Sequence, residues 1–172
     1  MKTTYDPSGI ETSFINILDD IYLKGRLQRS VLILPAVFGG PDEETQCPVW
    51  VQWYQNLRYI KTLNALGVST VVSAGNDRSY SEDSTHFPAM LQVYEYGKLR
   101  TPVLVSGAVD LSGVRASFSQ ALGTEFGSTY WAPGKSVACA GMHNESDIVY
   151  KSGTSFSAPM VSCMCALVAR GI

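Results

Sequence analysis

Short apolar runs alternate with helix-like stretches along most of this chain. Residues 11–25 and 49–67 carry apolar side chains at helical spacing, and each stretch ends in a glycine. Both therefore predict helices, the first of them capped by Thr12 or Ser13. Four other runs are short, apolar and rich in β-branched or small residues, which predicts strands: 30–40, 68–76, 101–110 and 135–141.

The order of these elements predicts the fold class. Strands that are apolar without alternation, separated by helices, are typical of an α/β protein whose parallel sheet carries helices on its faces. Ligands bind such sheets at the carboxyl ends of the strands, which here are residues 37–40 and 73–76. The polar stretch 77–101 predicts a long surface excursion.

Composition limits the classes of function open to the chain. Its 172 residues, 45% hydrophobic and 16% charged, predict one globular domain over residues 1–172. The net charge of −2, without a basic cluster, argues against a nucleic-acid partner. No apolar run approaches the roughly 20 residues of a membrane span, so no membrane partner is expected. The polar N-terminus is unlike a signal peptide, and the localisation stays unknown.

The four cysteines are expected to be buried free thiols rather than metal ligands. Cys163 and Cys165 stand two residues apart on an apolar, helix-like stretch, which points them about 200° away from each other. Ligands of one metal ion must converge, so no metal site is predicted.

The segment "SGTSFSAP", residues 152–159, places a hydroxyl where a helix should begin. Pro159 is tolerated only in the first turns, so the helix is expected to start near Ser155, with Thr154 or Ser155 as its cap. From residue 156 to 168 the stretch is apolar nearly all round, which predicts a buried helix. Its N-terminus favours an oxygen that gains negative charge, although this segment by itself is better explained by an ordinary capping serine.

A second segment, "VVSAGN" at residues 71–76, ends a predicted strand in small residues. Another chain could lie against Ser73, Ala74 and Gly75, and the amide of Asn76 could donate a hydrogen bond into the crevice beside them. A turn asparagine with a left-handed backbone is the alternative explanation.

Several segments together resemble the subtilisin-like serine proteases, or subtilases, from about residue 11 to the end of the chain. The order of the segments agrees with that family, and the Gly-Thr-Ser-x-x-Ala-Pro signature is highly specific. The matching segments are "VFGGP" (37–41), "VVSAGN" (71–76), "HFPA", "VLVSGAVD" and "ASFS" (within 86–119), "WAPG" (131–134) and "SGTSFSAP" (152–159). The resemblance implies a three-layer fold, a parallel sheet with helices on both faces.

The resemblance also implies a role for each matching residue. Ser155 corresponds to the nucleophile, and Asn76 to the side chain that forms the oxyanion hole with the backbone N–H of Ser155. An extended polypeptide substrate is expected between two walls and beside the nucleophile; its contacts are Val37, Phe38 and Gly39 on one wall, Ser73, Ala74 and Gly75 on the other, and Thr154. No cofactor is implied; subtilases often bind calcium and are often secreted, but no calcium ligand cluster is visible here.

The Asp and His that complete the family's triad have no counterpart in these residues. Neither an Asp-x-Gly turn nor a His-Gly-x-His helix start is present, and the two histidines, His86 and His143, stand in polar segments. A serine without a base is a poor nucleophile, so we expect the chain alone to be close to inactive. We also expect the parallel sheet to be incomplete at its N-terminal side and to need the missing N-terminal half of the domain as a partner.

Three other readings follow from the same residues. A noncatalytic, degenerate subtilase that only binds peptides stays open as the alternative. An α/β-hydrolase is excluded because no Asp, Glu or His follows Ser155. A nucleotide-binding domain is excluded because acidic residues follow the glycines in "FGGPDEE", where they would repel phosphate.

Overall fold

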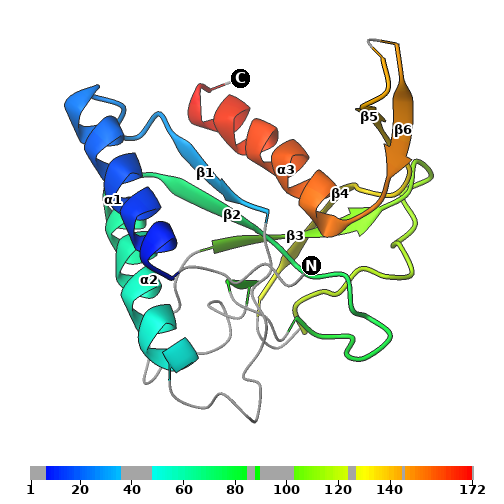
Figure 1. The fold of residues 1–172 in the computed structure, drawn as a ribbon, viewed down its shortest axis with the longest axis horizontal. Helices are drawn as coiled ribbons and strands as arrows, with labels where there is room; N and C mark the ends of the chain where they lie inside the picture. The colour runs from blue at the N-terminus through cyan, green and yellow to red at the C-terminus, as the bar shows by residue number, and fades with distance from the viewer. Residues whose placement is uncertain are drawn as a thin grey trace.

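The computed structural model describes residues 7–35, 48–84, 88–89, 103–123, 127–144 and 146–171. At its centre is a four-stranded sheet in the order β1-β2-β3-β4, in which every neighbouring pair is parallel. Figure 1 shows these strands crossing the middle of the molecule. The strands are β1 (Val31–Leu34), β2 (Ser69–Ser73), β3 (Val103–Val109) and β4 (Thr129–Pro133).

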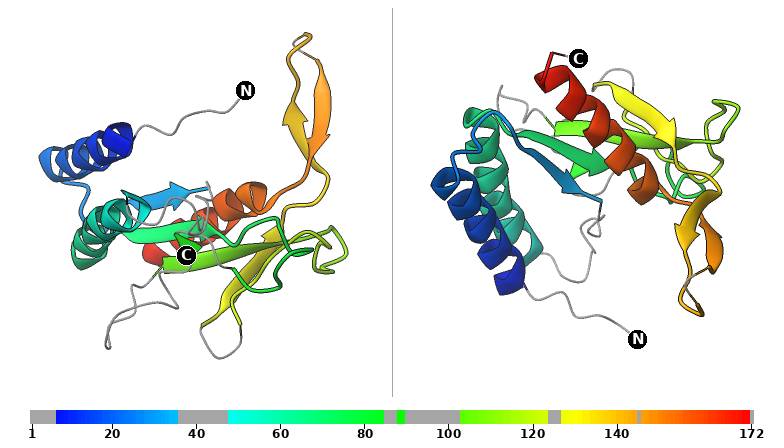
Figure 2. Two further views of the ribbon diagram at one scale, coloured as in Figure 1. Left: turned by 60° about the horizontal axis from the view of Figure 1, so that its bottom comes forward. Right: turned by 90° about the horizontal axis from the view of Figure 1, so that it is seen from above.

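Helices cover both faces of this sheet. The helices α1 (Pro7–Leu23) and α2 (Pro48–Ala65) pack together on one side, and α3 (Thr154–Ala169) lies across the other (Figures 1 and 2). Successive side chains of β2 therefore enter different cores: Val72 packs with the α1–α2 layer, and Val71 packs with α3. This arrangement confirms the expected α/β fold with three layers. No described helix is long and apolar enough to cross a membrane.

The first helix begins earlier than its sequence pattern predicted. It starts at Pro7, whose fixed φ suits the first helical position, and Ser13 lies inside it with its hydroxyl bonded to the Gly9 carbonyl. The prediction of Thr12 or Ser13 as its cap is therefore wrong. Both helix ends on this face were predicted correctly, because Gly25 and Gly67 take positive φ angles of 60° and 78° just beyond the helices.

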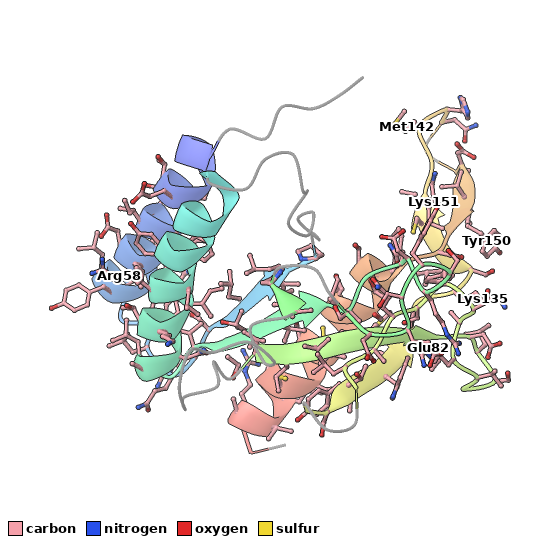
Figure 3. The ribbon with its side chains drawn as sticks, turned by 90° about the horizontal axis from the view of Figure 1, so that it is seen from below. Arg58, Glu82, Lys135, Met142, Tyr150 and Lys151 are labelled. Carbon is pink, nitrogen blue, oxygen red and sulfur yellow. The ribbon has the colours of Figure 1, made fainter. Side chains whose placement is uncertain are left out.

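Residues 135–141 form a strand, but not one of the parallel sheet. Within them β5 (Val137–Ala140) pairs antiparallel with β6 (Ile148–Lys151) as a separate hairpin. Figure 3 shows Met142, Tyr150 and Lys151 on this hairpin, which stands away from the sheet. The fourth parallel strand is β4, which the sequence analysis did not predict as a strand. Tyr130 and Trp131 are exposed on this edge strand, so it lacks the apolar run of a buried strand.

The strand expected over residues 30–40 is shorter and less buried than predicted. It ends at Leu34, before Pro35, and Ile33 is 37% exposed. β1 is the edge of the sheet as described, so one side of its backbone ladder has no neighbouring strand among the described residues. Residues 36–40, with the predicted site residues Val37, Phe38 and Gly39, lie outside the described residues.

The last helix is buried on one side only, which corrects the prediction of a helix buried all round. The buried side chains are Thr154, Ser157, Ala158, Val161 and Ser162. The outward side exposes an apolar stripe, defined here as Met160, Met164, Leu167 and Val168. The sheet covers only the side of α3 that faces it, and no described element covers the other.

The cysteines were predicted to be buried, and for Cys163 this is wrong. Cys163 is exposed, whereas Cys139 and Cys165 are partly buried and all three are free. Cys47 lies outside the described residues.

The predicted surface excursion 77–101 is partly anchored. Ser84, Pro88 and Ala89 are buried, and Ala89 belongs to the core beneath α1 and α2. The excursion is therefore attached to the body of the molecule at Ser84 and at residues 88–89.

Candidate active site

The first turn of α3 and the turn after β2 meet at one end of the sheet. Close contacts between small residues bring them there: the Gly153 N–H donates to the Gly134 carbonyl at 2.8 Å, just before α3 begins. A Cβ atom added to Gly134 would stand 2.7 Å from the Ala108 Cβ and 2.9 Å from the Gly153 oxygen, so only glycine fits. The Ala-Pro-Gly segment is thus a support for the start of the helix.

The side chain of Asn76 is tied to this helix start through Thr154. Its Oδ1 accepts hydrogen bonds from the Thr154 N–H at 2.8 Å and from the Thr154 hydroxyl at 3.1 Å. The same hydroxyl accepts a bond from the Gly75 N–H at 3.2 Å. With two donors on its oxygen, the amide of Asn76 directs its NH₂ group away from Thr154, and Asn76 itself is exposed.

Ser155 follows directly, half-buried in the first turn of α3. Gly153 is the N-cap residue, and no side chain caps the helix, so the prediction of Thr154 or Ser155 as the cap is wrong. The Ser155 hydroxyl instead donates to the carbonyl oxygen of Pro35, just beyond the end of β1, at 2.5 Å. A hydroxyl that makes no cap bond weakens the explanation of Ser155 as an ordinary capping serine.

The predicted substrate wall Ser73, Ala74 and Gly75 is buried at the end of β2. The Ala74 N–H donates to the Ser106 carbonyl at 2.9 Å, and its own carbonyl accepts from the Ser84 hydroxyl at 2.5 Å. These backbone groups are already paired, so the segment is a rigid support for Asn76. Contact of these residues, and of the fully buried Thr154, with a substrate stays a prediction.

A sequence model of the family described as "Subtilase family" matches residues 39–171. The chain belongs to the subtilase family. No curated protein matches this subtilase chain.

Solved protease structures share the fold of this subtilase chain. The prenylagaramide maturation protease PagA aligns with a TM-score of 0.62 at 19% identity, over 99% of this chain and 53% of PagA. The PatG macrocyclase in complex with peptide aligns with 0.61 at 22%, over 97% and 41%. The S41 psychrophilic protease aligns with 0.65 at 15%, over 99% and 52%. The chain thus spans about half the length of the structures that it matches.

His143, the histidine of this subtilase chain that the structure describes, makes no hydrogen bond to Ser155. His143 is exposed in the turn between β5 and β6, where its backbone N–H donates to the Asp147 carboxylate at 3.2 Å. His86 lies outside the described residues. Within the ranges that the structure describes, no three His, Cys, Asp or Glu side chains gather as metal ligands would.

Sequence reasoning missed the part that Thr154 plays in this site. It treated the residue as a cap and a substrate contact, whereas the hydroxyl links Gly75 to Asn76. The sequence does show a hydroxyl residue immediately before Ser155. Its hydrogen-bond partners, Gly75 and Asn76, stand 79 and 78 residues away along the chain, so local patterns could not reveal them.

Proposed function

We propose that this chain carries the nucleophile and the oxyanion donor of a serine endopeptidase of the subtilase type. The observation that carries the proposal is the pair of hydrogen bonds from Thr154 to the Asn76 amide oxygen, beside Ser155. They orient the amide without help from a substrate, and a pre-oriented donor is what stabilises charge in a transition state.

In the proposed reaction the Ser155 Oγ attacks the carbonyl carbon of a peptide bond and passes its proton to a base. The developing oxyanion accepts hydrogen bonds from Asn76 Nδ2 and from the backbone N–H of Ser155, in the positive field at the start of α3. The C–N bond breaks as the base returns its proton to the leaving amine. Water then attacks the acyl-enzyme with the same base, which releases the acid and restores Ser155. No cofactor takes part.

We infer that the acid and the base come from elements outside these 172 residues. Ser155 Oγ points at Pro35, at the end of the edge strand β1, so a strand that pairs with β1 would arrive beside the nucleophile. The apolar stripe of α3 offers further uncovered surface. The partner proposed for this surface is the remaining half of the peptidase domain, and an extended polypeptide is the substrate.

A fluorophosphonate probe with added imidazole tests this function. The probe labels a serine that a base has activated, and free imidazole can supply the base that the chain lacks. We expect slow labelling of Ser155 in the purified chain and faster labelling when imidazole is added. Ser155→Ala should carry no label at residue 155, with or without imidazole. Intact-mass and peptide mass spectrometry locate the label. Ser117→Ala, a change at an exposed serine elsewhere on the chain, is the control and should label like the wild type.

The contribution of Asn76 is tested by Asn76→Ala in the same assay. In subtilisin the loss of the oxyanion asparagine lowers kcat by about 10²–10³, and we expect a drop of about that size in the imidazole-assisted rate. An unchanged labelling rate of Ser155 in Asn76→Ala would contradict the role of Asn76. No labelling of Ser155 with or without imidazole would contradict the nucleophile, and would favour the noncatalytic peptide-binding reading.

A further inference from the structure

The loop that follows Asn76 folds back and pairs with a second segment of the chain. Residues 77–84 run beside residues 118–121, and Asp83 and Ala121 form a parallel bridge. Figure 3 shows Glu82 on this loop. Backbone hydrogen bonds of 2.7–3.2 Å join the two segments, from Arg78 to Phe118, from Ala121 to Glu82 and from Ser84 to Ala121.

The side chain of Gln120 fills the inside of this loop. It is 0% exposed, and its Nε2 donates to the carbonyls of Ser81 at 3.1 Å and Asp83 at 3.0 Å. One buried amide therefore satisfies two carbonyls of the returning chain. Such a group holds backbone in place more firmly than an apolar side chain of the same size, because its bonds have direction.

Gln120 also contacts Gly75, the residue that precedes Asn76. Its N–H donates to the Gly75 carbonyl at 3.0 Å. Its Oε1, which has no hydrogen-bond partner among the described residues, lies so close to Gly75 that a Cβ there would overlap it. Since the Gly75 N–H is bonded to Thr154, this glycine is held between Gln120 on one side and the start of α3 on the other.

We propose that Gln120 is a positioning residue for the oxyanion donor. By holding Ser81 and Asp83, its side-chain amide sets where the Gly75–Asn76 turn stands relative to the first turn of α3. Gln120 touches neither substrate nor reacting atoms in this scheme and acts only through Asn76. The inference rests on the proposed function of Asn76, but the placement of that side chain can be measured without any activity.

The first experiment follows the side-chain NH₂ resonances of Asn76 in ¹⁵N-labelled full chain, assigned by their loss in Asn76→Ala. Gln120→Met keeps the length of the side chain and removes both donors. We expect it to shift or broaden the Asn76 resonances while the backbone signals of α1 and α2 stay in place. Thr70→Val is the matched control, since Thr70 is equally buried on β2 and its hydroxyl has no partner among the described residues.

Gln120→Glu, of the same shape but without the paired donors, is the second variant and should move the Asn76 resonances in the same way. Retention of the α1 and α2 signals shows that a variant is folded. Unchanged Asn76 resonances in folded Gln120→Met or Gln120→Glu protein would overturn the proposal.

The second experiment is a double-mutant cycle on the imidazole-assisted labelling of Ser155. A displaced catalytic donor can lower a rate by about tenfold to a hundredfold, and we expect such a drop for Gln120→Met alone. In the Asn76→Ala background the same change should have no further effect, because the residue acts through Asn76. An equal drop in both backgrounds would mean that Gln120 only supports the fold. If wild-type Ser155 is never labelled, the proposed function fails, and the NMR experiment still decides the position of Asn76.

Discussion

Asn76 is an exposed side chain whose orientation depends on buried neighbours. Thr154 holds its oxygen, and Gly75 before it is bonded through both backbone groups, to Thr154 and to Gln120. Gly75 has a φ of 110°, which residues with a Cβ atom rarely adopt. The placement of the Asn76 side chain is therefore decided by atoms of three segments that are far apart in the sequence.

We expect Gly75→Ala to destabilise the protein more than a similar change elsewhere. The added Cβ would overlap Gln120 Oε1 as well as strain the backbone, which we estimate to cost about 2–5 kcal/mol. Gly113→Ala is the control, since Gly113 also has a positive φ but nothing lies within 4 Å of its added Cβ. It should lose only about 1–2 kcal/mol. Denaturant unfolding measures both, and equal losses would contradict the crowding at Gly75.

At the scale of elements, α3 reaches the site because small residues let it approach the sheet. The Ser106 hydroxyl of β3 donates to Ser157 at 2.9 Å, and Ser157 donates in turn to the Thr154 carbonyl at 2.8 Å. Ala158 beside it is fully buried. Larger side chains at these positions would lift the helix, and with it the turn that carries Ser155, away from β3.

The turn after β3 is another element that one polar side chain organises. The Asp110 carboxylate accepts hydrogen bonds from the Ser112 hydroxyl and from the N–H groups of Ser112 and Val114. The bond from the Ser112 side chain is the main reason that the pKa of Asp110 lies below its ordinary value of 3.8. Ionisation of the Asp110 carboxyl group therefore stabilises the folded state.

This turn should give the protein a stability that depends on pH. Because the pKa is lowered in the folded state, the stabilisation is complete at neutral pH and is lost as the pH falls from about 4 through the lowered pKa. Asp110→Ala should therefore be less stable than the wild type at pH 7, and the difference should narrow toward pH 3. Denaturant unfolding at several pH values checks this; a difference that stays constant with pH would contradict it.

At the scale of the whole molecule, apolar surface is left uncovered on the α3 side. The apolar stripe of α3 includes Met164 and Val168, which are 64% and 74% exposed, and β1 is an edge strand. A helix that covers a sheet ordinarily exposes polar side chains on its outward side, and an open sheet edge is ordinarily covered or blunted. This surface is the one that we propose the remaining half of the peptidase domain to cover.

We expect the isolated chain to associate with itself as its concentration rises, because no element among the described residues covers the stripe. Met164→Glu should reduce this association without lowering stability, since the side chain already faces solvent. Leu111→Glu, at an exposed leucine in a surface turn, is the control and should not reduce it. Analytical ultracentrifugation and thermal unfolding measure both properties. A wild-type monomer with a sharp, cooperative transition at high concentration would contradict the need for a complementing half.

The helices α1 and α2 and the strands β2 and β3 could be predicted from the sequence because their signals are local. Apolar spacing, β-branched runs and a terminating glycine act within about one element's length, and Gly67 ends its helix as predicted. The hairpin of β5 and β6 and the edge strand β4 could not be assigned in this way. A run such as residues 135–141 indicates a strand, but its partner depends on which chain lies beside it.

For the site, Asn76 and Ser155 were singled out only by the resemblance of several segments to the subtilases, because neither segment by itself favoured a catalytic role. Their surroundings were beyond the reach of local patterns. Thr154 meets Asn76 across 78 residues, and Gln120 meets Ser81 and Asp83 across 39 and 37. Hydrogen bonds of this kind form only when distant segments pack, because direction and burial, rather than spacing along the chain, select the partners.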